Sequence, residues 1–400
     1  MKERTNALVL ERMTLATCLG LGLDAHAAAL AAGRSGLCPC DLPHVGLETL
    51  IGEVDGLEET PLPRRLAAYD CRNNRLAWRG LQADGFADAV LARRAEIGPR
   101  RIGVFVGSST SGIDRTERAY RERRDDGPLP DWFDYRHTHN AFSPAAFVQD
   151  ALGLEGVAQV VATACSSSAK AFAAAKRHLQ AGLCDAAVVG GVDSLCQTTL
   201  YGFNALELVA REPCRPWDPG RQGISLAEAA GFALVALRPR GAAGGGFAVL
   251  GHGESSDAHH MSAPHPEGAG AARAMRASLD MAGLPPDAIG YVNLHGTGTL
   301  ANDEAEDRAV LAALGPRVPC RSTKGLTGHA LGAAGIVELV LLCLGLEERR
   351  LPPMPTTRTI DAALKANVRT ESEPCRTRFG LTNAFGFGGS NCALVVGAGA

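Results

Sequence analysis

Short apolar runs bounded by glycine recur along the chain and predict β-strands. Six of them lie at 101–109, 157–164, 185–193, 231–237, 290–296 and 391–399. Between these runs, apolar residues recur at helical spacing over 142–152, 167–182, 270–283, 302–314 and 330–348. Strands that alternate with helices favour a largely parallel sheet system with both faces covered, so we expect an α/β fold.

A glycine-rich connector, "RPRGAAGGG" at 238–246, divides the pattern near residue 240. On each side of it a residue capable of chemistry closes an apolar run, Cys165 before the connector and His295 after it. We therefore predict two similar halves, residues 1–240 and 241–400. The charged stretch "RERRDDGPLP" at 121–130 is typical of an exposed loop.

The N-terminus has two interpretations. Lys2, Arg4 and Arg12 precede "LATCLGLGL", which resembles a secretory signal, but Glu3, Glu11 and Asp24 interrupt that pattern. The alternative is a first strand followed by a glycine turn and a helix, and this is the interpretation that the acidic residues favour.

Composition and charge narrow the function classes. The 400 residues carry 40 basic and 43 acidic side chains, and the resulting net charge of −3 gives no whole-molecule attraction to nucleic acid. The 12 cysteines include no CxxC pair, so we expect small buried thiols in a reducing cytoplasm. The apolar run 336–346 is broken by Glu338 and is too short to span a bilayer.

A single thiol, Cys165, lies where the apolar run "VVATA" gives way to an alanine-rich helical pattern. Unpaired N–H groups and the helix dipole favour a thiolate at a helix N-terminus, so this position predicts a lowered pKa and a nucleophile. A buried, inert cysteine is the alternative.

Three further stretches carry candidate polar groups. In "NLHGTGTLANDEAE" at 293–306, His295 closes a strand, and Thr297 and Thr299 offer hydroxyls for a polar ligand tail. In "STKGLTGHALGAAGIVE" at 322–338, His329 is predicted at a helix start, where a histidine stays neutral and donates an N–H to an oxyanion; Lys324 and Glu338 flank it.

The third stretch, "TNAFGFGGSN" at 382–391, is a glycine-dense loop that contains Phe385 and Phe387. Such a loop allows close backbone approach and free N–H groups for an oxyanion hole, although it is also typical of a simple turn. Three histidines lie close together in the sequence and could be read as metal ligands, namely His259, His260 and His265. No pattern of carboxylates or cysteines completes a ligand set around them, so we predict no metal site there. His137 and His139 are expected in a surface loop.

Together these stretches resemble the β-ketoacyl-acyl carrier protein synthases, the condensing enzymes of fatty acid and polyketide synthesis, in their elongating Cys-His-His branch. The resemblance extends from about residue 100 onward and rests on "TACSSSA", "HGTGT", "STKGLTGHALGAAG", "NAFGFGGSN", "SSDAHHMSAPHPEG" and "CRPWDPGRQGISLAEAAG". It implies the thiolase fold, in which two βαβαβαββ halves stack as five layers, α-β-α-β-α, with the active site between them.

The resemblance also implies the roles of the residues. Cys165 takes the acyl chain from an acyl carrier protein, and His295 and His329 stabilise the enolate that forms when malonyl carrier protein loses CO₂. Lys324 and Glu338 orient His329, and Phe387 gates the acyl pocket. Substrates arrive on the phosphopantetheine arm of the carrier protein, and no bound metal, nucleotide or redox cofactor is implied.

Several departures from the family pattern concern the substrate rather than the chemistry. Gln222 and Ile224 stand where the family commonly has Asp and Phe, and "LAEAAG" at 226–231 replaces a glycine-richer run. These features are similar to ketosynthases of secondary metabolism, of the aryl-polyene type. Two alternatives remain open: a chain-length-factor-like partner without catalysis, which would lack Cys165, and a thiolase, for which Cys392 lies one strand position too late.

Two kinds of partner follow from the resemblance. An acidic acyl carrier protein should dock on arginines, either Arg64 and Arg65 or the group Arg121, Arg123 and Arg124. The run "VAQVVATA" at 157–164 is apolar at nearly every position, as in a strand covered on both faces. We therefore expect a dimer, either of identical chains or with a homologous ketosynthase-like subunit.

Overall fold

The computed structural model describes residues 6–240 and 246–399. Lys2, Glu3 and Arg4 of the signal-like stretch and residues 241–245 of the connector lie outside the described residues. The helices of the described ranges include none with the length and apolar character needed to cross a membrane.

All six predicted strands and all five predicted helices are present. The N-terminal segment is a strand, a turn and a helix, as its acidic residues favoured. Up to residue 240 the elements are β1 (Asn6–Thr17), β2 (Gly20–Leu21), α1 (Leu23–Ala32), β3 (Cys38–Pro39), β4 (Leu50–Ile51), α2 (Arg72–Gln82), α3 (Phe86–Ile97), β5 (Ile102–Gly107), α4 (Ile113–Glu122), α5 (Ser143–Leu152), β6 (Ala158–Val161), α6 (Ser167–Gln180), β7 (Ala186–Asp193), α7 (Gln197–Ala205) and β8 (Ala229–Pro239).

The second part of the chain repeats the alternation of strands and helices. Its elements are β9 (Phe247–Ser256), α8 (Ala269–Ala282), β10 (Tyr291–Asn293), α9 (Leu300–Leu314), β11 (Cys320–Arg321), α10 (Lys324–Thr327), α11 (Ala334–Glu347), β12 (Arg350–Leu351), β13 (Glu373–Pro374), β14 (Phe379–Gly386) and β15 (Ser390–Ala398).

The two parts have the same strand order. In the first the order is β1-β8-β7-β5-β6, and in the second it is β9-β15-β14-β10-β11. In the order just given, neighbouring strands among the first three of each set are antiparallel. The last two strands of each set continue the sheet in parallel. The sets are not separate sheets, because Leu8, Val9 and Leu10 of β1 also pair with β9 and join them into one eleven-stranded sheet that includes β2.

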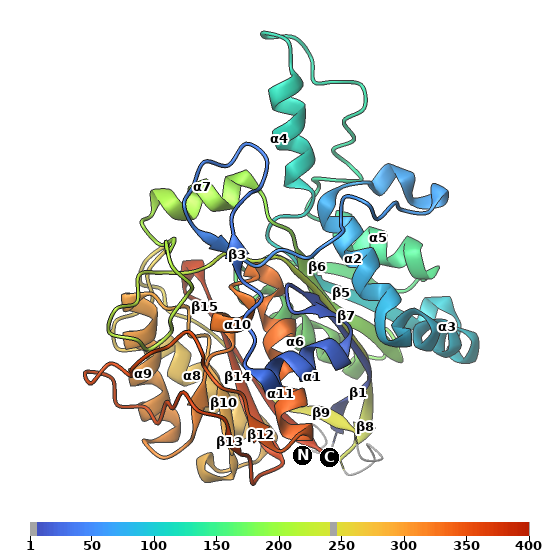
Figure 1. Ribbon diagram of the computed structural model, residues 1–400. Helices are drawn as coiled ribbons and strands as arrows, with labels where there is room; N and C mark the ends of the chain where they lie inside the picture. Colours follow the sequence, from blue (N-terminus) through green and yellow to red (C-terminus); the bar gives the residue numbers. More distant parts are fainter. Residues whose placement is uncertain (1–5, 241–245, 400) are drawn as a thin grey trace.

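The layers follow from three hydrophobic cores. Helices α2, α3 and α5 pack on the outer face of the first strand set, through Leu76, Phe86 and Phe147. Helices α8 and α9 cover the outer face of the second set. Between the two sets lie α6 and α11, which Figure 1 shows at the centre of the molecule. Helix α11 is buried on every side from Ala334 to Leu346 and is apolar there apart from Glu338, as expected of a central helix.

The strand that leads to Cys165 lies at the end of the sheet. A strand covered on both faces was expected over 157–164, and both faces of β6 do pack on apolar cores, Val157 and Val161 on the central core and Ala158 and Val160 on the core that includes α5. β6 is also the end strand of the sheet, so one of its edges has no partner strand within the described chain. An edge strand presents a row of backbone N–H and C=O groups that a strand of another chain can pair with. Helix α4 stands away from the body above this region (Figure 1).

Candidate active site

Cys165 lies in a tight turn between β6 and α6. Ala164 adopts a left-handed φ of 52°, which is uncommon for a residue with a side chain and turns the backbone sharply before the thiol. The Ser167 hydroxyl accepts from the Thr163 N–H at 2.9 Å and donates to the Ala164 carbonyl at 2.5 Å. These bonds hold the turn, and Cys165 is 6% exposed at its end.

The predicted lowering of the thiol pKa is wrong for the resting protein. Burial raises the pKa of Cys165 to about 12, and the positive charge of Lys324 and the backbone N–H of Phe387 offset this only in part. The desolvation of a thiolate outweighs the helix terminus because the thiol is almost fully buried. Cys165 therefore holds its proton at rest.

His329 is the nearest group to the thiol, with Nε2 3.0 Å from Sγ of Cys165. It does not start a helix as predicted. Instead its backbone pairs with a strand-like segment, accepting from Ala227 and donating to Ser225. Burial, and then the charge of Lys324, holds the pKa of His329 well below its usual range, so the imidazole is neutral for a different reason than the predicted one.

His295 completes the group on the other side, with its ring centroid 5.3 Å from that of His329 at an angle of 84°. Lys324 contacts His295 rather than His329, contrary to the expectation from the resemblance. Its ammonium donates to the His295 carbonyl and to Glu338, and lies 3.4 Å from Nδ1 of His295. Burial and then Lys324 hold the pKa of His295 well below its usual range. Because Nδ1 accepts from Lys324, the ring proton is on Nε2, toward the cavity.

Glu306 was missed by the sequence interpretation, although it belongs to the acidic run after "HGTGT". Its two carboxylate oxygens accept the N–H groups of His295 and Gly296, each at 2.8 Å, and the Asn383 amide at 2.9 Å. Burial raises the pKa of Glu306 to about 7. This one side chain ties the turn that carries His295 to strand β14.

Asp193, at the end of β7, was also missed. It accepts from the backbone N–H groups of Ser109 and Thr110 and from Gly332, at 2.6–2.8 Å, and from hydroxyls of the same loop. Gly332 follows His329 by three residues, so Asp193 links the loop after β5 to the histidine segment. An acid that closes an apolar strand was the available signal.

The glycine-dense loop approaches the nucleophile closely. A side chain at Gly386 would meet the Thr163 carbonyl at 2.7 Å and the Cys165 nitrogen at 3.1 Å, so only glycine fits there. This approach brings the Phe387 N–H to the thiol. The Phe385 ring lies 5.8 Å from that of His295, and the Phe387 ring lies 5.3 Å from that of Phe203 on α7.

A mainly apolar cavity of about 240 Å³ opens onto Cys165, His295 and His329. Thr297 and Thr299 line it, with their hydroxyls 3.0 Å apart, and Thr299 also caps α9. Other lining side chains are Phe203, Leu206, Leu208, Ile224, Phe385 and Phe387. Of the two family departures, Ile224 faces this cavity, whereas Gln222 is exposed and does not line it.

Among the described residues, the one group of histidine, cysteine and carboxylate ligands spaced to hold a metal is Cys165, His295 and His329, whose ligand atoms lie within 4.8 Å of one another. The ammonium of Lys324 beside His295 opposes a second cation there. His259 and His265 lie with ring centroids 5.2 Å apart in a loop beside the cavity. His137 and His139 lie in the loop after α4, half-buried against Asp134 and Thr116.

Family comparisons agree with this geometry. The family model for the β-ketoacyl synthase N-terminal domain matches residues 72–239, and the model for the β-ketoacyl synthase C-terminal domain matches residues 247–358. The chain belongs to the β-ketoacyl synthase family. It is 31% identical to 3-oxoacyl-[acyl-carrier-protein] synthase 2 of Staphylococcus aureus over 315 residues, which cover 74% of this chain and 76% of the relative. It is 32% identical to the Vibrio cholerae enzyme of the same name over 322 residues, 74% of this chain and 75% of the relative.

Solved β-ketoacyl synthases match along nearly the whole chain. A structure of the ketosynthase ApeO in complex with its chain length factor ApeC, from Xenorhabdus doucetiae, matches with a TM-score of 0.88 and 36% identity over 98% of both chains. A β-ketoacyl synthase from Burkholderia phymatum matches with the same TM-score and 27% identity, over 98% of this chain and 99% of that one. These likenesses confirm the thiolase-like fold.

Proposed function

We propose that the protein is a β-ketoacyl-acyl carrier protein synthase that uses Cys165 as nucleophile and His295 and His329 as the partners of decarboxylation. The observation that carries this proposal is the 3.0 Å approach of His329 Nε2 to Cys165 Sγ at the end of an apolar cavity, with neutral His295 alongside. A condensing enzyme needs a thiol and two neutral hydrogen-bond donors at one point, and this site provides them.

Acyl transfer comes first. The thiol is protonated at rest, so its proton passes to His329 Nε2 as sulfur attacks the acyl thioester of the carrier protein. The backbone N–H groups of Cys165 and Phe387 stabilise the tetrahedral oxyanion. When the carbon–sulfur bond to the phosphopantetheine breaks, His329 returns the proton to the departing thiolate, and the acyl chain stays on Cys165.

Condensation follows on the same atoms. Malonyl carrier protein enters, its carboxylate leaves as CO₂, and the two electrons of that bond form an enolate whose oxygen accepts N–H donors from His295 and His329. The enolate carbon attacks the acyl thioester, the tetrahedral intermediate collapses, and the Cys165 thiolate leaves and takes up one proton from water, the proton that the overall reaction consumes. The product is a 3-ketoacyl carrier protein two carbons longer. Decarboxylation drives the new bond, so this reaction calls for no bound cofactor.

Two other functions have less support. A non-catalytic chain-length-factor-like subunit has no use for a thiol and two histidines assembled within 4.8 Å. A thiolase would need a second cysteine at the reaction centre. Cys392 is fully buried in β15, and among the described residues that line the cavity Cys165 is the one cysteine.

We place the enzyme in polyketide-type rather than housekeeping synthesis, in the aryl-polyene branch that its sequence resembles. The support is Ile224 in the cavity wall, where the family commonly has Phe, and the 36% identity to the ApeO–ApeC ketosynthase structure. All twelve cysteines lie in described residues and are free thiols, which supports a cytoplasmic location.

The second partner we propose is another ketosynthase-like chain, identical or homologous, that pairs along β6. The support is that β6 ends the sheet and leaves apolar residues half-exposed. The halves 1–240 and 241–400 would then each contribute one repeat of the fold. Native mass measurement distinguishes a homodimer from a chain that becomes stable only when co-expressed with a homologue, and an active monomer would contradict both.

The carrier protein, in this proposal, docks on arginines near α4. Arg124 is exposed there, whereas Arg65 already donates to the Asp150 and Ala151 carbonyls at the end of α5. The test of the whole function is intact-mass analysis after mixing the enzyme with panels of acyl and malonyl carrier proteins. We expect an acyl-enzyme first and then a carrier-bound chain longer by two carbons.

A further inference from the structure

Helix α7 begins on a carboxylate from another helix. Within the described residues, none of the side chains of α7 caps its own start. Instead Glu117 of α4 accepts the N–H of Gln197 at 3.2 Å, the N–H of Thr198 at 2.6 Å and the Thr198 hydroxyl at 2.7 Å. The first N–H groups of a helix have no partner inside it, and a carboxylate there also favours the helix dipole. Glu117 therefore fixes where α7 starts.

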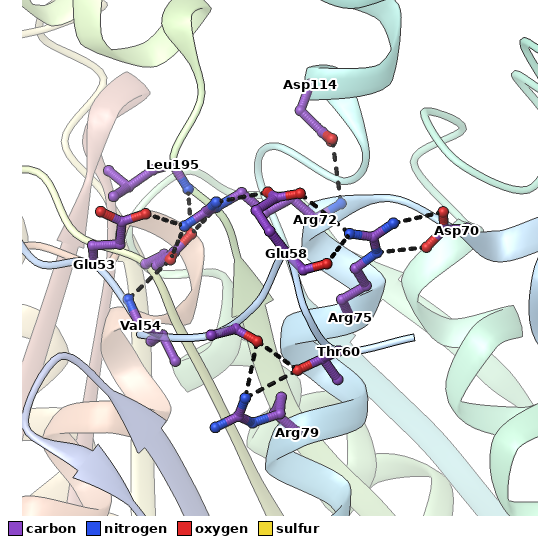
Figure 2. Close-up of polar contacts among 12 residues, drawn as sticks. Glu53, Val54, Glu58, Thr60, Asp70, Arg72, Arg75, Arg79, Asp114 and Leu195 are labelled. Atoms are coloured by element: carbon purple, nitrogen blue, oxygen red, sulfur yellow. Dashed lines mark hydrogen bonds and ion pairs between the residues drawn. The ribbon is translucent and has the colours of Figure 1, made fainter. Parts of the chain in front are cut away.

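The segment before α7 is fixed separately, at Leu195, two residues ahead of the helix. Glu228 is fully buried and accepts the Leu195 N–H at 3.0 Å, while its other contacts are the guanidinium of Arg72 and the Val54 N–H. Figure 2 shows Arg72 among its partners, with Leu195 beside it. The approach to α7 is thus anchored in the body of the protein, and its first turn is anchored on α4, which stands away from the body (Figure 1).

The other end of α7 reaches the active site. Phe203 lies six residues after Gln197, about 9 Å along a helix, and its ring contacts that of Phe387 with centroids 5.3 Å apart. The N–H of Phe387 faces the Cys165 thiol, and both rings line the reaction cavity. Any shift or fraying at the start of α7 changes how Phe203 holds Phe387.

The link between α4 and α7 does not run through a packed core. A cavity of about 310 Å³ lies there, lined by Glu117, Arg118, Arg121 and Gln197 among others. Polar contacts bridge it, those of Glu117 and a 3.2 Å bond from Arg121 to Gln197. Removing the Glu117 carboxylate leaves the apolar cores intact, so its effect on the site can be separated from its effect on folding.

We propose that Glu117 is a positioning residue for acyl transfer: through α7 it sets Phe203 against Phe387 and so controls access of the acyl group to Cys165. This inference rests on the proposed function of Cys165 and adds α4 to the elements on which the gate depends. A binding event on α4 that displaces Glu117 would then alter the gate from outside the cavity.

The test compares the acylation rate of Cys165 in three variants, measured by intact mass with a short acyl thioester of N-acetylcysteamine, which avoids any effect on carrier-protein docking. We expect Glu117→Ala to slow acylation about five-fold, the factor that loss of one helix cap corresponds to. Glu117→Gln keeps one acceptor oxygen and should slow it about two-fold. The matched control is Glu122→Ala on the same helix, whose carboxylate contacts Arg118 and Trp132 and not α7, and which should match the wild type.

A double-mutant cycle with Phe203→Ala separates positioning from general loosening. If Glu117 acts through Phe203, Glu117→Ala slows acylation little or not at all once Phe203 has been truncated. An equal slowing in both backgrounds would overturn the inference, as would a Glu117→Ala rate equal to that of the Glu122→Ala control. Should Glu117→Ala not fold, the same cycle with Glu117→Gln decides. Absence of acylation in the wild type would instead refute the proposed function.

Discussion

The two strand sets place different chemistry at matching positions. After β6 in the first set comes Cys165, and after β11, which has the same place in the second set, come Lys324 and His329. After β5 comes a loop of serine and threonine, and after its counterpart β10 comes His295. The same backbone arrangement therefore supplies the nucleophile from one half and the hydrogen-bond donors from the other. The ends of equivalent strands fix where these residues lie, and the residues of the following loops decide which chemical groups stand there.

The halves also share a way of holding these turns. In the first, Asp193 binds the N–H groups of the loop after β5, and in the second, Glu306 binds those of His295 and Gly296 after β10. Each is a buried carboxylate that satisfies backbone donors no neighbouring strand can reach. The difference is that Glu306 binds the turn that contains His295 itself, whereas Asp193 binds the loop after β5 and the segment after His329.

The largest expected effect separates the donors from the nucleophile. His295→Ala should slow malonyl decarboxylation about 10²–10³-fold, the usual consequence of losing an oxyanion donor, and leave acylation of Cys165 nearly unchanged. Release of CO₂ and intact enzyme mass measure the two steps. The control is His260→Ala, an exposed histidine away from the thiol, which should leave both steps unchanged. Equal loss of both steps in His295→Ala would contradict the division of labour.

The next effect concerns the stability that Asp193 gives to the first half of the chain. Asp193→Ala leaves several buried N–H groups unpaired and should lower the free energy of unfolding by about 3 kcal/mol. The matched control is Asp185→Ala at the other end of β7, where the carboxylate is exposed against Arg101, with an expected change below about 1 kcal/mol. Urea unfolding of both variants gives the comparison, and similar losses would remove Asp193 from this role.

Glu306 adds a pH dependence to the second half. Its pKa in the folded protein is raised to about 7, above the unfolded value of about 4.3, so its contribution to stability is fully present below the unfolded value and is lost as pH rises toward 7. Compared with Glu306→Gln, the wild type should lose on the order of 2–3 kcal/mol between pH 4.5 and 7, to judge by a shift of this size. Urea unfolding across that range measures it, and a difference independent of pH would count against a titrating Glu306.

The smallest effect lies on the surface above the site. Arg124→Glu should raise KM for carrier-bound substrate severalfold, because charge reversal repels an acidic carrier protein, and should leave N-acetylcysteamine thioesters unaffected. Arg65→Glu serves as comparison, since that guanidinium is already engaged by α5. Loss with both kinds of substrate would indicate damage to the site rather than to docking.

Periodicity and motifs were enough to predict much of the molecule. The apolar runs predicted β5, β6, β7, β8, β10 and β15 but not β9 or β14, and the motifs identified Cys165, His295 and His329, whose ligand atoms lie close together. Contacts between segments that are far apart in the sequence could not be predicted from periodicity and motifs. The pairing of Leu8 to Leu10 with β9 and the bond of Lys324 to His295 depend on register and side-chain placement, which the local pattern does not contain.

One prediction failed because burial acts against the local signal. The helix terminus favours a thiolate at Cys165, but burial raises the pKa of the thiol by more, so the proton stays. The apolar run of β6 also led to the expectation of a dimer, which stays a prediction: within the described chain β6 is an edge strand. The apolar run indicates that β6 has neighbours, but it does not show whether these belong to the same chain or to a partner subunit.

The central claim is that the thiol of the first half takes the acyl chain, and intact mass of Cys165→Ala tests it most directly. Incubated with acyl carrier protein, the wild type should gain the mass of the acyl group at Cys165. Cys165→Ala should gain none, while it still releases CO₂ from malonyl carrier protein, because His295 and His329 remain in place. An acyl adduct on Cys165→Ala would contradict the account and place the nucleophile elsewhere.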